Sequence, residues 1–117
     1  MKASLTDLLA RLPGPVSPGW PEGERFAQAF GHGSMSVELY APVGIDPQQP
    51  HDRDELYVVA RGHGVFVRGA APRSSREPVQ AGDVLFVPAH EPHRFETFSD
   101  DFATWVVFYG PPGGESP

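Results

Sequence analysis

The feature that most constrains the fold is a series of short apolar stretches, separated by turn residues, that begins near residue 25 and continues almost to the C-terminus. In one of them Met35, Val37 and Leu39 alternate with polar neighbours, as in a strand with one buried face. Turn signals recur about every ten residues, and a second helical pattern is missing. This pattern predicts an all-β sandwich or barrel. The expected strands are 25–30, 34–40, 55–61, 65–68, 84–87, 94–98 and 102–109.

Two segments of this series depart from simple alternation. Residues 69–77 are polar and are expected to form a solvated hairpin tip. Residues 102–109 are apolar on both faces, which indicates a strand that is buried on both sides. One of those sides can meet another subunit, so we expect a homodimer.

The N-terminal region differs in pattern from the strands. Leu5, Leu8, Leu9 and Leu12 follow the spacing of an amphipathic helix, which Pro13 should end. The apolar face of this helix must cover either its own barrel or a partner subunit. We therefore expect residues 1–24 to form the helix and a connector rich in proline and glycine, 25–110 the barrel, and 111–117 a flexible tail, because the tail carries no packing signal.

Charge and cysteine content exclude several classes of function. Nine basic and fifteen acidic residues give a formal charge of -6, which argues against nucleic acid or anionic lipid as the main partner. The chain has no cysteine, so any metal must be held by nitrogen and oxygen. Its start does not resemble a signal peptide and no stretch reaches transmembrane length, so we expect a cytoplasmic protein.

The candidate chemistry lies in two stretches. In an extended backbone Gln49, His51, Glu55 and Tyr57 would project from the same side, because side chains alternate between faces. The second stretch, 82–93, ends with His93 just after an apolar strand. If the fold brings the two stretches together, their histidines and carboxylate form a metal site.

These stretches resemble the paired motifs of the cupin superfamily. The first motif reads roughly Gly-x5-His-x-His-x3-Glu-x6-Gly, and His51, Glu55 and Gly62 match it. The leading histidine of the family falls on Gln49, and the opening glycine sits one residue late, at Gly44. The second motif reads roughly Gly-x5-Pro-x-Gly-x2-His-x3-Asn. Its matches are Gly82, Pro88 and His93, while its middle glycine and last asparagine fall on His90 and Thr97.

The resemblance spans 34–109 and implies a double-stranded jelly-roll barrel that holds one divalent ion, Fe, Mn, Ni or Zn, through His51, Glu55 and His93. Gln49 is either a fourth ligand or a residue that orients a metal-bound water. Tyr57 is either a catalytic residue or a core side chain. An apolar cavity for a small oxygenated molecule is expected, rimmed by Phe86, Phe95, Trp105 and Val107.

Activity stays open, because cupins include dioxygenases, isomerases, decarboxylases, lyases, polyketide cyclase-like proteins and plain binders. The alternatives to an enzyme are a non-catalytic binder of small molecules or sugars and a structural module with an empty site. Glu38 and Tyr40 are expected either to line the cavity or to be solvated, and His32, His63 and His90 to be exposed.

Overall fold

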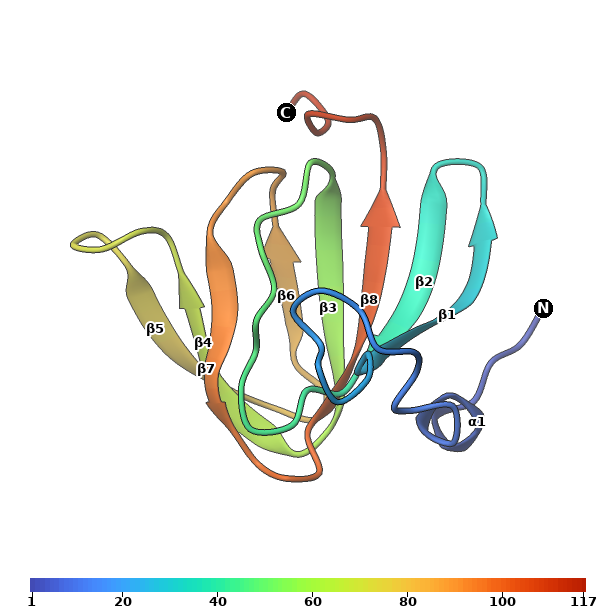
Figure 1. Ribbon diagram of the computed structural model, residues 1–117. Helices are drawn as coiled ribbons and strands as arrows, with labels where there is room; N and C mark the ends of the chain where they lie inside the picture. Colours follow the sequence, from blue (N-terminus) through green and yellow to red (C-terminus); the bar gives the residue numbers. More distant parts are fainter.

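A computed structural model describes the whole chain, residues 1–117. Eight strands form two antiparallel sheets, with the orders β1-β2-β8-β3-β6 and β5-β4-β7, and one short helix lies outside them (Figure 1). This arrangement confirms the predicted all-β jelly roll. The elements are α1 (Leu5–Leu9), β1 (Phe26–His32), β2 (Met35–Tyr40), β3 (Asp54–Arg61), β4 (His63–Arg68), β5 (Ser75–Gln80), β6 (Val84–Val87), β7 (His93–Phe98) and β8 (Ala103–Tyr109).

The main core lies between the two sheets. Tyr57 and Val59 on β3 pack there, together with Val106 on β8, against Phe66 and Phe95 of the smaller sheet. The two phenyl rings lie 5.0 Å apart between centroids, and both side chains are buried. Burial of this apolar surface holds the sheets together, and it places the inward-facing residues of β3 and β8 beside those of β7.

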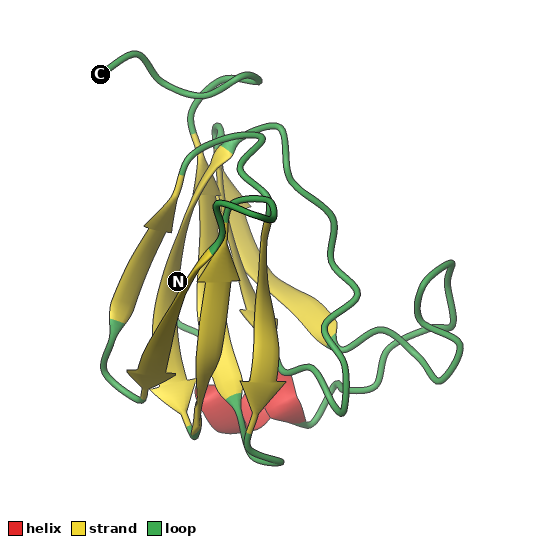
Figure 2. Ribbon diagram, turned by 90° about the vertical axis from the view of Figure 1, so that its left-hand side faces the viewer, coloured by secondary structure: helices red, strands yellow, loops and turns green.

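The helix covers part of the outer face of the larger sheet. Leu8 is buried there against Leu39, Ala41 and Ala103. The side chain of Ser4 caps the helix by accepting a hydrogen bond from the Asp7 N–H at 3.2 Å. Figure 2 shows the helix at one end of the strands. Of the two coverings expected for its apolar face, the structure therefore shows the chain's own sheet. No helix in the chain is long and apolar enough to cross a membrane.

The structure refines the expectation for residues 69–77. Residues 69–74 form the largely exposed tip between β4 and β5, as expected, but the strand β5 already begins at Ser75 and pairs with β4. The strand is at a sheet edge, and Val79 is its one buried residue. Such an edge strand is held by backbone pairing and shows no apolar alternation in its sequence. An edge position also tolerates Pro78, which has no N–H to donate.

Residues 111–117, for which the sequence shows no packing signal, make hydrogen bonds to the loop before β3 and to its first residue. The Gly113 N–H donates to the carbonyl oxygen of Asp52 at 2.6 Å, and the Glu115 N–H donates to Asp54 Oδ2 at 2.9 Å. Asp54 is buried, and its Oδ1 accepts from the Ala89 N–H at 2.9 Å. The tail is held because a buried carboxylate needs donors, and its backbone supplies one of them.

Candidate metal centre

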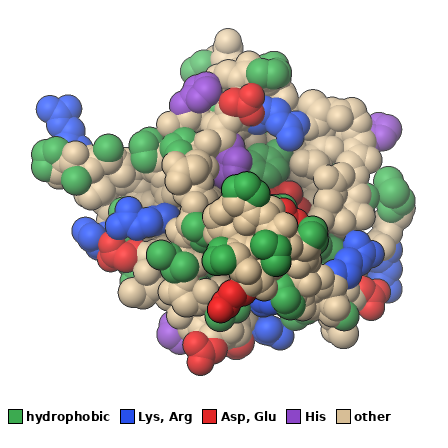
Figure 3. Space-filling view, in the orientation of Figure 1, with side chains coloured by type: hydrophobic (Ala, Val, Ile, Leu, Met, Phe, Trp, Pro, Cys, Tyr) green, Lys and Arg blue, Asp and Glu red, His purple; other side chains and the backbone are tan.

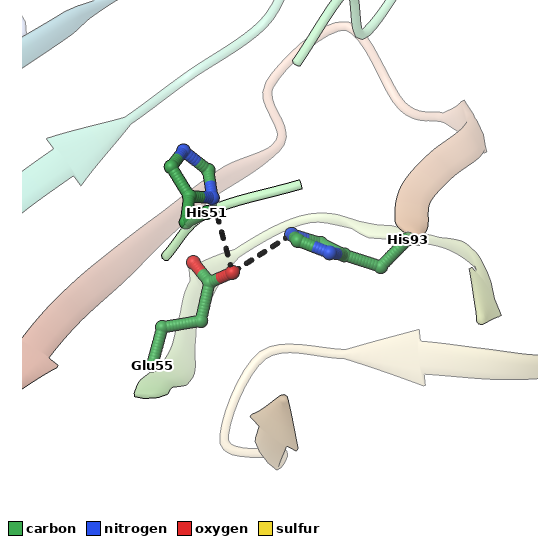
Figure 4. A group of neighbouring side chains, drawn as sticks. All are labelled: His51, Glu55 and His93. Carbon is green, nitrogen blue, oxygen red and sulfur yellow. Dashed lines mark hydrogen bonds and ion pairs between the residues drawn. The ribbon is translucent and has the colours of Figure 1, made fainter. Parts of the chain in front are cut away.

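Three side chains from distant parts of the sequence meet at one end of the core. Glu55 is the second residue of β3, His93 is the first residue of β7, and His51 belongs to the loop before β3. Glu55 Oε1 lies 3.2 Å from His51 Nδ1 and 2.9 Å from His93 Nε2 (Figure 4). Each residue offers one ligand atom, and these atoms lie within 4.8 Å of one another. The predicted meeting of the two stretches is therefore observed.

The backbone also joins the two loops that carry the histidines. The His90 N–H donates to the carbonyl oxygen of His51 at 2.7 Å. His90 has a φ of 70°, which is uncommon for a residue other than glycine. Glycine occupies this position in the motif that the sequence resembles, so the unusual conformation is kept although the residue differs. The side chain of His90 is exposed, as are those of His32 and His63, as expected.

The burial of this group fits a cation. Glu55 and His93 are buried, whereas the His51 side chain is 36% exposed and faces the opening. Glu55 Oε2 is buried and has no hydrogen-bond partner. An unsatisfied carboxylate oxygen inside a protein is costly. A metal ion between the three residues would satisfy it, and the nitrogen and oxygen donors suit a divalent transition metal.

The hydrogen bonds of His93 orient its ring for ligation. Its Nδ1 lies 2.8 Å from the carbonyl oxygen of Glu91, which can only accept, so the network assigns a proton to Nδ1. Nε2 then points its lone pair towards the site, as metal-binding histidines do. Without a cation, Nε2 and Glu55 Oε1 are two acceptors at 2.9 Å, so a proton has to lie between them.

The pKa values of the pair agree with this interpretation. Burial lowers the pKa of His93, but its hydrogen bond and charge interaction with Glu55 outweigh that effect and raise the pKa above its usual value. Burial raises the pKa of Glu55, and its hydrogen bonds to His51 and His93 outweigh this and lower the pKa. Both shifts favour a charged pair, so a proton takes the place that a metal ion would occupy.

Tyr57 borders the site but is held as a hydrogen-bond donor. Its hydroxyl lies 3.1 Å from His93 Nε2 and donates to Gln48 Oε1 at 2.9 Å. The side chain is 1% exposed, and burial raises its pKa well above the ordinary value, with the charges of Glu55 and Asp46 adding to the effect. Tyr57 therefore stays protonated, and the geometry suits a positioning residue better than a base.

Sequence reasoning missed the residues that hold Tyr57. Gln48 donates through Nε2 to Asp46 Oδ2 at 2.6 Å, and the Phe95 N–H donates to the same oxygen at 2.8 Å. The Tyr40 hydroxyl donates to Asp46 Oδ1. A buried aspartate in a proline-rich loop has no sequence signal of its own, because its donors come from β2, β7 and its own loop.

Gln49 lies in the cavity wall, but its side chain makes no hydrogen bond within the chain. The alternation that placed it beside His51 assumes an extended strand, and β3 begins only at Asp54. Whether Gln49 is a ligand stays a prediction.

A cavity of about 540 Å³ adjoins the site, and two of the three candidate ligands, His51 and Glu55, lie in its wall. His51, Glu55 and Tyr57 line it, and Val106 and Phe108 supply apolar surface. Figure 3 shows this hollow from outside, with a histidine and acidic atoms inside it. Glu38 and Tyr40, which were expected either to line the cavity or to be solvated, line it. A hollow of about 610 Å³ lies elsewhere, along β4, β5 and β7, without a cluster of metal-ligating side chains.

None of the four residues expected to rim the cavity lies in its wall. Phe86 is 46% exposed, and Trp105 and Val107 lie on the outer face of the sheet, where Trp105 packs near the helix. Phe95 is buried in the core and is absent from the cavity wall. The reason is register. Glu55 pairs with Phe108 and Tyr57 with Val106, so the even-numbered residues of β8 face inward.

The chain is similar in sequence to several known proteins. It is 39% identical over 80 residues to an uncharacterized protein of Streptomyces coelicolor, covering 67% of this chain and 72% of that protein. It is 35% identical over 77 residues to the HTH-type transcriptional activator RhaS of Yersinia pestis. That match covers 66% of this chain but only 27% of RhaS.

Solved structures share the fold at lower identity. A Bacillus halodurans protein, BH2720, superposes with a TM-score of 0.70 and 17% identity over 100% of this chain and 83% of its own. A cupin 2 conserved barrel domain protein of Salinispora arenicola gives a TM-score of 0.60 and 17% identity, covering 73% of this chain and 74% of its own. At these identities the likeness concerns the fold alone. The family model for the cupin domain matches residues 36–109, and the chain belongs to this family.

Proposed function

We propose that the protein binds one divalent metal ion through His51, Glu55 and His93 and uses it to act on a small oxygenated organic molecule in the adjoining cavity. The observation that carries this proposal is the convergence of two histidine nitrogens on Glu55 Oε1, beside a second carboxylate oxygen, Oε2, that is buried and has no partner. An ion pair between Glu55 and the histidines, without a metal, does not explain why Glu55 Oε2 has no partner. A buried ion pair stabilises a protein only when its remaining lone pairs are satisfied.

The donor set determines which ions suit the site. Two imidazole nitrogens and one carboxylate on one side of an ion leave open positions, an arrangement associated with non-haem iron and also suited to manganese, nickel or zinc. Such an ion, when bound, polarises an oxygen of the substrate. The chain orients the ligands through the Glu91 carbonyl and Tyr57 and covers one side of the site with apolar residues. Gln49, in the cavity wall, is available as a further ligand or as a partner for a bound water.

Elemental analysis of protein purified without an affinity tag tests the metal. We expect a metal-to-chain ratio near one and a melting temperature that falls on chelation. In the His93→Gln variant we expect little bound metal and a melting temperature that chelation does not change. His63→Gln is the matched control, because His63 is exposed and lies outside the cluster. A ratio near zero, with unchanged melting after chelation and after metal addition, would remove the proposal.

A second candidate function is ligand binding without catalysis. The match to part of RhaS favours it, because RhaS is named as a transcriptional activator rather than an enzyme. Oxygen uptake and substrate loss over a panel of a diketone, a flavonol, an acireductone and a uronate separate the two candidates. Turnover that His93→Gln abolishes supports the enzyme, whereas tight binding that persists with chelator supports the binder.

A further inference from the structure

The cavity contains a second carboxylate that the metal centre does not use. Glu38 lies on β2, half-buried, and its side chain forms part of the cavity wall. Glu38 makes no hydrogen bond or ion pair within the chain, whereas the other acid of the cavity, Glu55, is bound to His51 and His93. An acceptor in a cavity wall with no internal partner is available to a ligand.

The sheet register places Glu38 at a useful distance from the candidate ligands. Glu38 pairs with Val106 on β8, and Val106 pairs with Tyr57 on β3, so the three residues form one row across the same face. Glu55 lies in the next inward-facing row, opposite Phe108. Strands two apart in a sheet are separated by about 10 Å. A molecule of a few heavy atoms can therefore reach the metal centre at one end and Glu38 at the other.

Aromatic rings accompany Glu38 at its end of the cavity. Phe26 pairs with Tyr40, the next inward residue of β2. The connector brings Trp20 onto this pair, with ring centroids 5.8 Å from Phe26 and 6.0 Å from Tyr40. Figure 1 shows the connector crossing in front of the larger sheet. A carboxylate beside aromatic rings is a surface that attracts an organic cation.

No lysine or arginine lines this cavity. Arg53, the nearest along the chain to His51, lies over the Phe108 ring at 5.7 Å and donates to the Ser34 carbonyl. Arg25 donates to the Ala41 carbonyl at 2.8 Å. An anionic group on a ligand would therefore meet Glu38 with no positive side chain to offset it. Burial raises the pKa of Glu38, and Glu55 adds to this while His51 opposes it, so a bound cation would relieve the cost of keeping Glu38 ionised.

We propose that the cavity takes a small molecule whose protonated amine contacts Glu38 and the Trp20 ring while its oxygen atoms face the metal centre. For the oxygen atoms of the ligand, this inference rests on the proposed function. For the amine, it rests on the position of Glu38 in the cavity wall. It predicts weak binding of any ligand that places an anionic group at the Glu38 end of the cavity.

Three chelating probes of the same chain length test the amine end on protein loaded with Ni(II). They are β-alanine hydroxamate, butyrohydroxamate and succinic monohydroxamate, which end in an ammonium, a methyl and a carboxylate. By calorimetry we expect the amine to bind on the order of tenfold more tightly than the neutral probe, and the acid more weakly than both. In Glu38→Gln the amine advantage should vanish, and in Glu38→Lys the acid should bind best.

Glu96→Gln is the matched control, because Glu96 is a carboxylate of the outer surface paired with Arg76. It should leave the order of the three probes unchanged. The affinity ratio of two probes is compared between wild type and variant, so differences in the chelating strength of the probes cancel. If the hydroxamates bind, an amine-to-neutral affinity ratio that is the same in wild type and Glu38→Gln would overturn the inference.

A metal-free measurement separates this inference from the metal proposal. Choline and its uncharged isostere 3,3-dimethylbutan-1-ol are titrated into the Trp105→Phe variant, whose fluorescence reports Trp20 alone. We expect choline to bind more tightly than the isostere, and Glu38→Gln to remove the difference. If no hydroxamate binds but choline is still preferred, the metal proposal fails and the amine site stands. If the isostere binds as well as choline, the amine site fails.

Discussion

Glu55 Oε1 and His93 Nε2 lie 2.9 Å apart although their strands, β3 and β7, belong to different sheets. The candidate metal centre therefore spans the interface between the sheets, and its geometry depends on how the two sheets pack. An ion held there would connect them directly. Metal binding and stability of the fold should be linked for this reason.

The stability of the metal-free protein should depend on pH through this pair. The pKa of Glu55 is lowered by folding, so its contribution is present above about pH 4.5 and is lost as pH falls through the folded pKa. The pKa of His93 is raised, so its contribution is present below about pH 6.5 and is lost as pH rises through the folded pKa. In EDTA-treated protein the difference in melting temperature between wild type and His93→Gln should peak between these values. A difference independent of pH would contradict the assignment.

Metal affinity should rise with pH. The proton that bridges His93 and Glu55 in the metal-free protein must leave before an ion binds, and the raised pKa of His93 moves this requirement towards neutral pH. We expect the Zn(II) dissociation constant, measured by calorimetry, to fall about tenfold per pH unit below the pKa of His93 and to level off above it. A constant affinity between about pH 5 and 8 would show that the ion binds elsewhere.

Removing the Tyr57 hydroxyl should weaken the fold without removing the metal. Tyr57→Phe leaves Gln48 Oε1 without its donor, and an unsatisfied buried acceptor costs about 1–3 kcal/mol. Urea unfolding measures this loss, and elemental analysis should find the metal content unchanged. Tyr109→Phe, at a half-buried tyrosine without a side-chain hydrogen bond, is the control. Loss of the metal in Tyr57→Phe would instead make Tyr57 part of the ligand set.

Asp46 should be important for folding although it is absent from the motifs. Its two carboxylate oxygens accept from Tyr40, from the Phe95 N–H and from both the backbone and side chain of Gln48. Asp46→Asn replaces an acceptor with a donor that faces donors, and we expect a loss of about 2–4 kcal/mol in unfolding free energy. Asp100→Asn, at an exposed turn, should be neutral. Equal stability of the two variants would refute the role of Asp46.

The homodimer stays a prediction, and a substitution on the outer face of the larger sheet can test it. Val84 and Phe86 are 59% and 46% exposed on β6, next to the apolar outer residues of β3. If a second subunit covers them, Phe86→Lys should convert the dimer to a monomer in sedimentation equilibrium while leaving the metal content unchanged. Glu77→Lys, on the exposed edge strand β5, is the control. A wild-type monomer would refute the dimer itself.

Local pattern alone predicted much of the protein. Alternation in β2 and β3 follows from the two-residue repeat of a strand, so Glu55 and Tyr57 were correctly assigned to one face. The leucine spacing identified the helix, although the helix ends at Leu9, earlier than the end predicted at Pro13. His51, Glu55 and His93 were found because their residue types can bind a metal and because the two stretches resemble the paired motifs of the cupin superfamily.

Tertiary structure decided what the two-residue repeat leaves open. Alternation does not say which face of β6 or β8 is inside, because this depends on the register with β3, so Phe86 and Trp105 were assigned to the wrong face. Gln48 and Asp46 act through partners on strands far away in the sequence, and no local pattern records such partners. Neighbouring residues determine a strand, but only long-range pairing determines what that strand faces.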